Sequence, residues 1–188
     1  MVYVFLANGF EEIEALAVVD VLRRAELDVR TVGVGEDFVI GSHQIPVAAD
    51  IYERDIVLDE TVEAIVLPGG MPGTINLEKS PVVGKAIDFA YENGKLICAI
   101  CAAPSILGHK GLLKGKNAIC FPGFEEELEG AVLSQSFVCR DGNIITAKGM
   151  GSAVEFGLQI AEILNRAPEV VGKLKELFDD VDAARDGN

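Results

Sequence analysis

The sequence predicts an α/β protein built around a mostly parallel sheet. Short β-branched runs alternate with longer segments of helical spacing along nearly the whole chain. Several of these runs, such as Val2–Ala7 (VYVFLA), are almost continuously apolar, which is typical of parallel strands buried on both faces. The composition is 49% hydrophobic and 24% charged, close to that of globular proteins. We therefore predict a single α/β domain covering residues 1–188.

The first elements form a βα unit followed by a second strand. Apolar residues recur at helical spacing after the first strand, which predicts a helix over Glu11–Ala25. Val29–Val34 is the next predicted strand. Phe38–Ala48 is interrupted by a glycine and a proline, so we expect an antiparallel excursion at a sheet edge.

The middle of the chain predicts two more parallel strands. Ala64–Leu67 is followed by the glycine-rich loop PGGMPGT, and Leu96–Ile100 by the turn CAAP. Between them, Ser80 and Pro81 are suited to the N-cap and first turn of a helix that ends at Asn93 and Gly94.

The last third predicts a hairpin and two helices. Phe137–Arg140 and Asn143–Ala147 flank an Asp-Gly turn, the pattern of a β-hairpin. Ser152 and Glu155 have capping-box spacing at the start of a helix. A terminal helix is expected through about Phe178, followed by an acidic, frayed tail over residues 179–188.

The charge balance argues against nucleic acid as a partner. Thirty acidic and 16 basic residues give a net charge of −14, which repels a phosphate backbone. The densest basic stretch, Lys110–Lys116, is interpreted as a solvated loop. No apolar run is long enough to span a membrane, and the start of the chain lacks the features of a signal peptide. We expect a cytoplasmic protein with no membrane partner.

The cysteine and histidine pattern predicts no metal site and no cofactor. The four cysteines lack the regular spacing of a disulfide scaffold, so reduced thiols are expected. Cys98 and Cys101 form a CxxC without a second one, and both His43 and His109 are isolated in the sequence. Neither a phosphate-binding loop nor a dinucleotide fingerprint is complete.

Cys101 is the strongest candidate nucleophile. It stands between small residues where a predicted parallel strand turns into a helix, an arrangement resembling a nucleophile elbow. Amides at a helix start would lower the pKa of the thiol and favour a thiolate. The alternative is a buried structural cysteine, because free cysteine is among the most buried residue types.

Glu14 is the candidate proton-transfer residue. It lies among apolar residues near the start of the first helix, where burial would raise the pKa of its carboxyl toward neutrality. The alternative is that Glu11, Glu12 and Glu14 merely complement the helix dipole.

The loop PGGMPGT could bring backbone N–H groups to a reacting oxygen, although a tight turn would also explain its glycines. For His109 we expect a role at a helix C-terminus, and for His43 simple exposure.

Four segments, in this order and spacing, carry a family resemblance. They are NGFEEIEA, IVLPGGMPG, ICAICAAP and ITAKGMGSAVEFG. The chain resembles the DJ-1/ThiJ/PfpI family over Val2 to about Leu164, and within it the parkinsonism-associated deglycase branch more than the PfpI proteases. Those proteases carry a histidine directly after the nucleophile, where this chain has Ala102.

The resemblance implies a flavodoxin-like three-layer α/β/α sandwich of the class I glutamine-amidotransferase-like type, usually homodimeric. It implies a reactive cysteine at Cys101, a glutamate bonded to it at Glu14, and oxyanion donors from Gly70 and Ala102 beside Gly69. An arginine that makes dimer and anion contacts corresponds to Arg24. Two positions depart from the pattern: His43 replaces an anion-contacting arginine, and Phe121 replaces a histidine found in some members.

The predicted function is a cofactor-independent, cysteine-dependent enzyme acting on reactive dicarbonyls or their glycated adducts, of the glyoxalase III or proposed protein deglycase kind. The alternative from another class is a thiol-based sensor or chaperone of the oxidative stress response. A cysteine peptidase is a third, weaker reading, because Ala102 occupies the place of the adjacent histidine.

Overall fold

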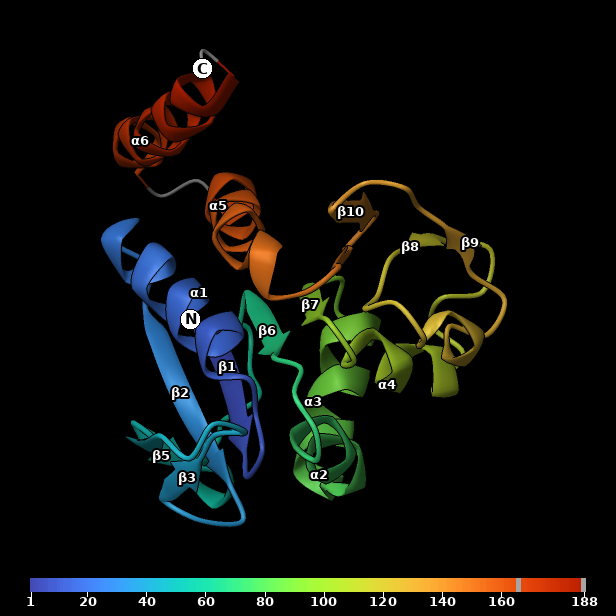
Figure 1. Ribbon diagram of the computed structural model, residues 1–188. Coiled ribbons are helices and arrows are strands. Elements are labelled where there is room, and N and C mark those ends of the chain that lie inside the picture. The colour runs from blue at the N-terminus through green and yellow to red at the C-terminus, as the bar shows by residue number, and fades with distance from the viewer. Residues whose placement is uncertain (165–166, 187–188) are drawn as a thin grey trace.

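A seven-stranded sheet forms the centre of the protein (Figure 1). The structure is a computed structural model and describes residues 1–164 and 167–186. The strands of this sheet are β1 (Val2–Ala7), β2 (Val29–Val34), β5 (Ile51–Tyr52), β6 (Ala64–Leu67), β7 (Leu96–Ile100), β10 (Val138–Asp141) and β11 (Ile144–Ala147). Their order is β10-β11-β7-β6-β1-β2-β5, and every neighbouring pair is parallel except β10 with β11. The predicted α/β class and mostly parallel sheet are therefore confirmed.

Helices cover both faces of the sheet and make the molecule three-layered (Figure 1). The helices are α1 (Glu12–Arg24), α2 (Gly73–Lys79), α3 (Pro81–Glu92), α4 (Pro104–His109), α5 (Ala153–Leu164) and α6 (Pro168–Asp186). Helices α1 and α5 lie on one face, and α2, α3 and α4 lie on the other. None of the helices in the described part of the chain is both long and apolar enough to cross a bilayer.

The central strand β1 shows why its sequence is apolar without interruption. Val2, Val4 and Leu6 point into the core beneath α1 and α5, whereas the residues between them point into the core beneath α2 to α4. Because side chains alternate along a strand and both faces are covered, every position of β1 is buried.

Several predicted elements are confirmed, and others differ. The strands at Val2–Ala7, Val29–Val34, Ala64–Leu67 and Leu96–Ile100 have the predicted bounds. Ser80 caps α3 through a hydrogen bond from the N–H of Val83 to its hydroxyl. The helix predicted to open with Ser152 and Glu155 is α5, which begins at Ala153, but the Ser152 hydroxyl closes the 3-10 turn η3 (Met150–Ser152) by donating to the carbonyl of Gly149. Helix α6 runs on to Asp186, beyond the predicted end near Phe178.

The predicted excursion is a hairpin outside the main sheet. Strands β3 (Phe38–Ile40) and β4 (Pro46–Ala48) pair antiparallel with each other in a sheet of their own. The edge of the main sheet is instead β5, which sequence reasoning missed because two residues carry no recognisable period. Reasoning from the sequence also missed α2, the 3-10 turns η1 (Glu53–Asp55) and η2 (Glu125–Glu127), and the small parallel pair β8 (Asn117–Ala118) and β9 (Val132–Leu133).

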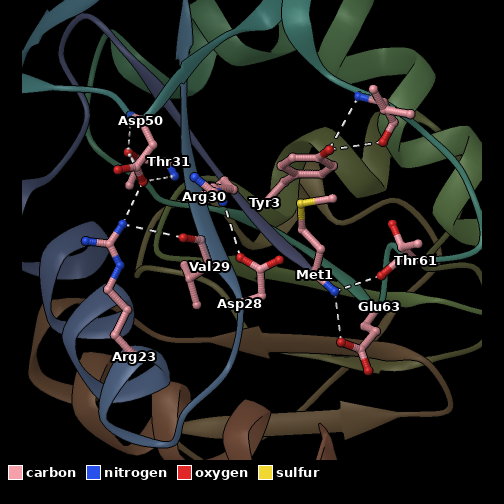
Figure 2. Close-up of polar contacts among 11 residues, drawn as sticks. Met1, Tyr3, Arg23, Asp28, Val29, Arg30, Thr31, Asp50, Thr61 and Glu63 are labelled. Atoms are coloured by element: carbon pink, nitrogen blue, oxygen red, sulfur yellow. Dashed lines mark hydrogen bonds and ion pairs between the residues drawn. The ribbon is translucent and has the colours of Figure 1, made fainter.

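The short edge strand β5 is held by a polar cluster around Asp50 (Figure 2). The N–H and hydroxyl of Thr31, on β2, both donate to Asp50 Oδ2, at 2.8 and 2.9 Å. Arg23, near the end of α1, reaches the same oxygen at 2.6 Å. The carboxylate of Asp50, directly before β5, thus connects this edge strand to α1 and β2. These charge-assisted hydrogen bonds compensate for the few backbone hydrogen bonds that a two-residue strand can make.

Candidate active site

Cys101 follows β7 and adopts a backbone conformation that residues other than glycine rarely adopt. Its φ is +64°, in the left-handed region. The turn is held from both sides: the N–H of Cys101 donates to Ala147 at the end of β11, and its carbonyl accepts from the N–H of Phe121 at 2.8 Å. The small residues Ala102 and Ala103 follow, and Pro104 begins α4. The predicted elbow is therefore present, with the thiol partly exposed.

The glycine-rich loop after β6 lies directly against this thiol. A Cβ on Gly69 would lie 2.6 Å from the Cβ of Cys101 and 2.7 Å from Oε2 of Glu14, so only glycine fits between them. The next residue, Gly70, has φ +89° and donates its N–H to the sulfur, as does Ala102. The close backbone approach expected from PGGMPGT is present, and Gly69, Gly70 and Ala102 all surround the sulfur.

Glu14 reaches the same place from the first turn of α1. Its side chain is 1% exposed, it accepts a hydrogen bond from the thiol of Cys101, and its Oε2 accepts the N–H of Gly69 at 3.0 Å. The carbonyl of Gly69 in turn accepts the N–H of Glu11 at 2.9 Å. The start of α1 and the glycine loop are thus tied together on both sides of Gly69. Glu14 and Cys101, 87 residues apart in sequence, form one hydrogen-bonded pair.

The two groups of this pair influence each other's protonation. Burial raises the pKa of Glu14 to about 7, although the hydrogen bonds from Cys101 and Gly69 oppose that rise. Burial and the neighbouring Glu14 charge raise the pKa of Cys101 to about 12. The expectation of a thiolate favoured by a helix start is wrong, because burial and the Glu14 charge outweigh the N–H groups of Ala102 and Gly70, which lower the pKa of Cys101. The pair therefore holds its proton on sulfur until Glu14 can accept it.

The other cysteines are less accessible. Cys98, Cys120 and Cys139 are all classed as buried, and burial raises the pKa of Cys98. Cys98 lies inside β7 and belongs to the core beneath α1 and α5. Cys98 and Cys101 thus occupy different environments despite their CxxC spacing.

Phe121 and Gly149 lie beside the thiol pair. The family resemblance singled out Phe121, whereas sequence reasoning did not identify Gly149 as a neighbour of Glu14. A Cβ on Gly149 would lie 3.1 Å from Cδ2 of Phe121 and 3.9 Å from Oε1 of Glu14. The ring and the carboxylate therefore share the space beside Gly149. Gly149 comes shortly after a parallel strand ends, the same signal that identified Cys101, and so could have been found.

His43 lies on the β3–β4 hairpin and faces the start of α1, away from the thiol pair. Its Nδ1 is 3.0 Å from Glu12 Oε2, and its N–H donates to Glu12 Oε1 at 2.8 Å. The hydrogen bond with Glu12 and the charge of Glu11 raise the pKa of His43. Within residues 1–164 and 167–186, Glu11, Glu12 and His43 are the one group with donor atoms close enough to hold a metal ion. The spacing argument missed it because its members come from two separate segments.

The remaining predicted residues lie away from the thiol. Arg24 is at the far end of α1, about 15 Å along the helix from Glu14, and pairs with Asp20 on the surface. His109 ends α4, as expected, but its ring also bridges Glu78 and Glu127. Those two carboxylates raise the pKa of His109. Within one chain, the structure thus brings together Cys101, Glu14, Gly69, Gly70 and Ala102, and leaves Arg24 and His43 outside.

Comparison with known proteins points to one family. The model of the DJ-1/PfpI family matches residues 1–163. Protein dj-1beta of Drosophila melanogaster is 36% identical over 175 residues, covering 92% of this chain and 90% of that protein. The glutathione-independent glyoxalase DJR-1.2 of Caenorhabditis elegans is 33% identical over 169 residues, covering 89% of each. A crystal structure of a DJ-1 superfamily protein from Salmonella typhimurium is 36% identical, covers 94% of this chain and 96% of its own, and superposes with a TM-score of 0.87. With near-complete coverage in sequence and structure, the chain belongs to the DJ-1/PfpI family, in its DJ-1-like branch.

Proposed function

We propose that this protein is a cofactor-independent enzyme that converts reactive 2-oxoaldehydes into 2-hydroxy acids. The observation that carries the proposal is the hydrogen bond between the Cys101 thiol and a buried carboxyl, Glu14, with two backbone N–H groups directed at the same sulfur. The glyoxalase name of the Caenorhabditis elegans relative supports the same reaction class.

The first step uses the pair as nucleophile and base. As the sulfur of Cys101 adds to the aldehyde carbon, its proton passes to Glu14 and from there to the new alkoxide oxygen, so that a hemithioacetal forms and Glu14 is again ionised. A carboxyl with a pKa of about 7 accepts and returns a proton readily near neutral pH. In this proposal the N–H groups of Gly70 and Ala102, which bond to the sulfur in the free protein, stabilise the oxygen on which negative charge develops.

The second step moves a proton between the two substrate carbons. Glu14 removes the proton from the former aldehyde carbon to give an enediol and returns a proton to the neighbouring carbon. The product is a thioester of Cys101 with a 2-hydroxy acid. Water then hydrolyses the thioester, releasing the acid and restoring the thiol, so that one water is consumed for each 2-oxoaldehyde.

Steady-state turnover of methylglyoxal tests the proposal. Purified protein is expected to produce many equivalents of lactate for each Cys101, whereas Cys101→Ser protein, purified in parallel, produces none. The parallel preparation controls for contaminating glyoxalases. Turnover that is equal in both preparations would refute the proposed chemistry. Release of amine from a glycated peptide, measured in the same pair, tests the deglycase variant of the reaction.

A redox sensor is the second candidate, and the partial exposure of Cys101 favours it. Two N–H groups that point at the sulfur could also hold the oxygens of an oxidised cysteine. The two functions differ in stoichiometry: a sensor is modified once by each oxidant molecule, whereas an enzyme turns over. Failure to exceed one equivalent of product per thiol would favour the sensor.

A further inference from the structure

Phe121 is bonded through its backbone to Cys101, and the residue is exposed to solvent. Its N–H is bonded to the carbonyl of Cys101 at 2.8 Å, and 46% of the residue is exposed. The ring packs against Gly149, where a Cβ would lie 3.1 Å from Cδ2 and 3.7 Å from Cε2. The backbone of Phe121 is thus bonded directly to the residue that carries the thiol.

The two oxygens of Glu14 face different surroundings. Oε2 accepts the N–H of Gly69 at 3.0 Å, whereas Oε1 lies 3.9 Å from the position that a Cβ on Gly149 would occupy. The Phe121 ring approaches that same position. Of the two oxygens, Oε1 is therefore the one nearer to Gly149, the glycine against which the ring of Phe121 packs.

Two further exposed apolar residues directly follow residues of the site in the chain. Met71 follows Gly70, whose N–H reaches the sulfur, and is 47% exposed; Met150 follows Gly149 and is 62% exposed. Phe121, Met71 and Met150 come from three separate segments of the chain, and we name them the apolar rim. Methionine adapts its shape to irregular apolar partners, and an aromatic ring offers them a flat surface.

We infer that Phe121 determines substrate specificity and that the apolar rim selects 2-oxoaldehydes with a hydrocarbon substituent. This inference rests on the proposed function. In a 2-oxoaldehyde, the aldehyde carbon bonds to sulfur and the neighbouring carbon exchanges its proton with Glu14. The substituent extends from that second carbon, so it lies against Phe121. An aryl or alkyl substituent covers apolar surface there, and glyoxal, which has only hydrogen, covers none.

The specificity constant, kcat/KM, of three substrates tests this inference in wild type and Phe121→Ala. Phenylglyoxal is expected to exceed glyoxal by about tenfold or more in wild type, the low end for apolar discrimination at a partly open site. In Phe121→Ala the phenylglyoxal-to-glyoxal ratio is expected to collapse by at least fivefold, and the methylglyoxal-to-glyoxal ratio by less. Tyr91→Ala removes another exposed aromatic side chain, on α3, and should leave the ratio unchanged. An unchanged ratio in Phe121→Ala would overturn the inference.

Alkylation of Cys101 provides a readout that does not need turnover. The rates of iodoacetamide and 2-iodo-N-phenylacetamide are compared on the protein and on N-acetylcysteine, which gives the intrinsic ratio. Wild type is expected to favour the phenyl reagent about tenfold over that ratio, and Phe121→Ala to lose the preference. Phe121→Leu serves as a second variant if Phe121→Ala does not fold.

The two assays separate the inference from the proposed function. If no 2-oxoaldehyde is turned over but the alkylation preference depends on Phe121, the enzymatic proposal fails while the apolar contact at Phe121 stands. If turnover is efficient but neither assay distinguishes wild type from Phe121→Ala, the function stands and the specificity role of Phe121 is refuted.

Discussion

The thiol of Cys101 and the carboxyl of Glu14 share their protons in a place that is largely shielded from water. Burial disfavours the charged form of each group, and the negative charge of one disfavours that of the other. The two groups therefore titrate as a coupled pair and not independently of each other. Its chemistry depends on both residues, and the following two predictions separate their contributions.

Substitution of the two nearby cysteines is expected to have opposite effects. Cys101→Ser should abolish dicarbonyl turnover and leave the thermal midpoint nearly unchanged, because a hydroxyl fits the turn but is a much weaker nucleophile. Cys98→Ser should retain turnover and lose about 1–3 kcal/mol of stability, because it places a hydroxyl in an apolar strand. Thermal melts and methylglyoxal kinetics on the same samples measure both. An inactive but fully stable Cys98→Ser protein would contradict this assignment.

Glu14→Gln is expected to slow turnover by about a hundred to ten thousand fold, because the amide keeps the volume but cannot accept and return a proton.

The same substitution also alters how the free energy of unfolding depends on pH. Burial raises the pKa of Glu14 from 4.5 to about 7, so protonated Glu14 favours the folded state. This contribution is complete below pH 4.5 and is lost as the pH rises through about 7, amounting to about 3 kcal/mol.

Chemical denaturation at pH 4.5 and pH 8 measures that loss. Wild type should lose more stability than Glu14→Gln over this interval. Glu155→Gln, an exposed glutamate on α5, is the matched control and should behave as wild type. If wild type and Glu14→Gln respond equally to pH, the carboxyl of Glu14 does not titrate in this range.

At the level of elements, the position of Glu14 depends on how α1 packs against α5. Gly157, on α5, brings the two helices close together: a Cβ there would lie 3.2 Å from the Cβ of Val21 and 3.4 Å from the Cα of Val18. Helix α1 packs against both the sheet and α5. This packing sets the position of its first turn, and therefore of Glu14, relative to the glycine loop. The packing of α1 against α5 thus helps to position Glu14.

Gly157→Leu is expected to reduce the free energy of unfolding by about 1–3 kcal/mol, because the added side chain overpacks the contact with α1. Gly84 on α3 is the matched control: it is also a helical glycine, but a Cβ there meets nothing within 4 Å. Gly84→Leu should raise stability by up to about 1 kcal/mol through better helix propensity. Equal effects of the two substitutions in urea denaturation would show that the α1–α5 contact tolerates a side chain.

The molecule as a whole supplies every group of the proposed reaction from its own side chains and backbone. Nucleophile, proton carrier and N–H donors are Cys101, Glu14, Gly70 and Ala102. We therefore expect methylglyoxal turnover to survive exhaustive dialysis against a chelator. A loss of activity that zinc restores would contradict this and would direct attention to Glu11, Glu12 and His43.

The predicted homodimer also belongs to this scale. On α1, Val21 is covered by α5 and α6 of the same chain, so its apolar side chain does not require a partner subunit. Leu16, by contrast, is 37% exposed, beside the more exposed Ile13. Sedimentation of wild type at micromolar concentration is expected to show a dimer, and Leu16→Asp a monomer. Val57→Asp, at another exposed apolar position, is the control, and a monomeric wild type would refute the prediction.

The sequence by itself determined the class of the fold and singled out Cys101 and Glu14 as candidate reacting groups. Buried parallel strands must be apolar throughout, so β1, β2, β6 and β7 could be located to the residue. Chemistry in such sheets gathers where parallel strands end, which made Cys101 and the loop at Gly69 and Gly70 identifiable from local sequence. The short strands β5, β8 and β9 could not be predicted, because two residues are too few to show a period.

Only the tertiary structure decided how these residues act on one another. The pKa of Cys101 depends on burial and on a carboxylate 87 residues away, and for this reason the local argument for a thiolate failed. The approach of Phe121 and Gly149 to Glu14, and the meeting of His43 with Glu11 and Glu12, likewise join segments that lie far apart in the chain. Local sequence specifies strands and turns through short-range forces, whereas protonation and substrate contacts depend on distances that exist only after the layers have packed.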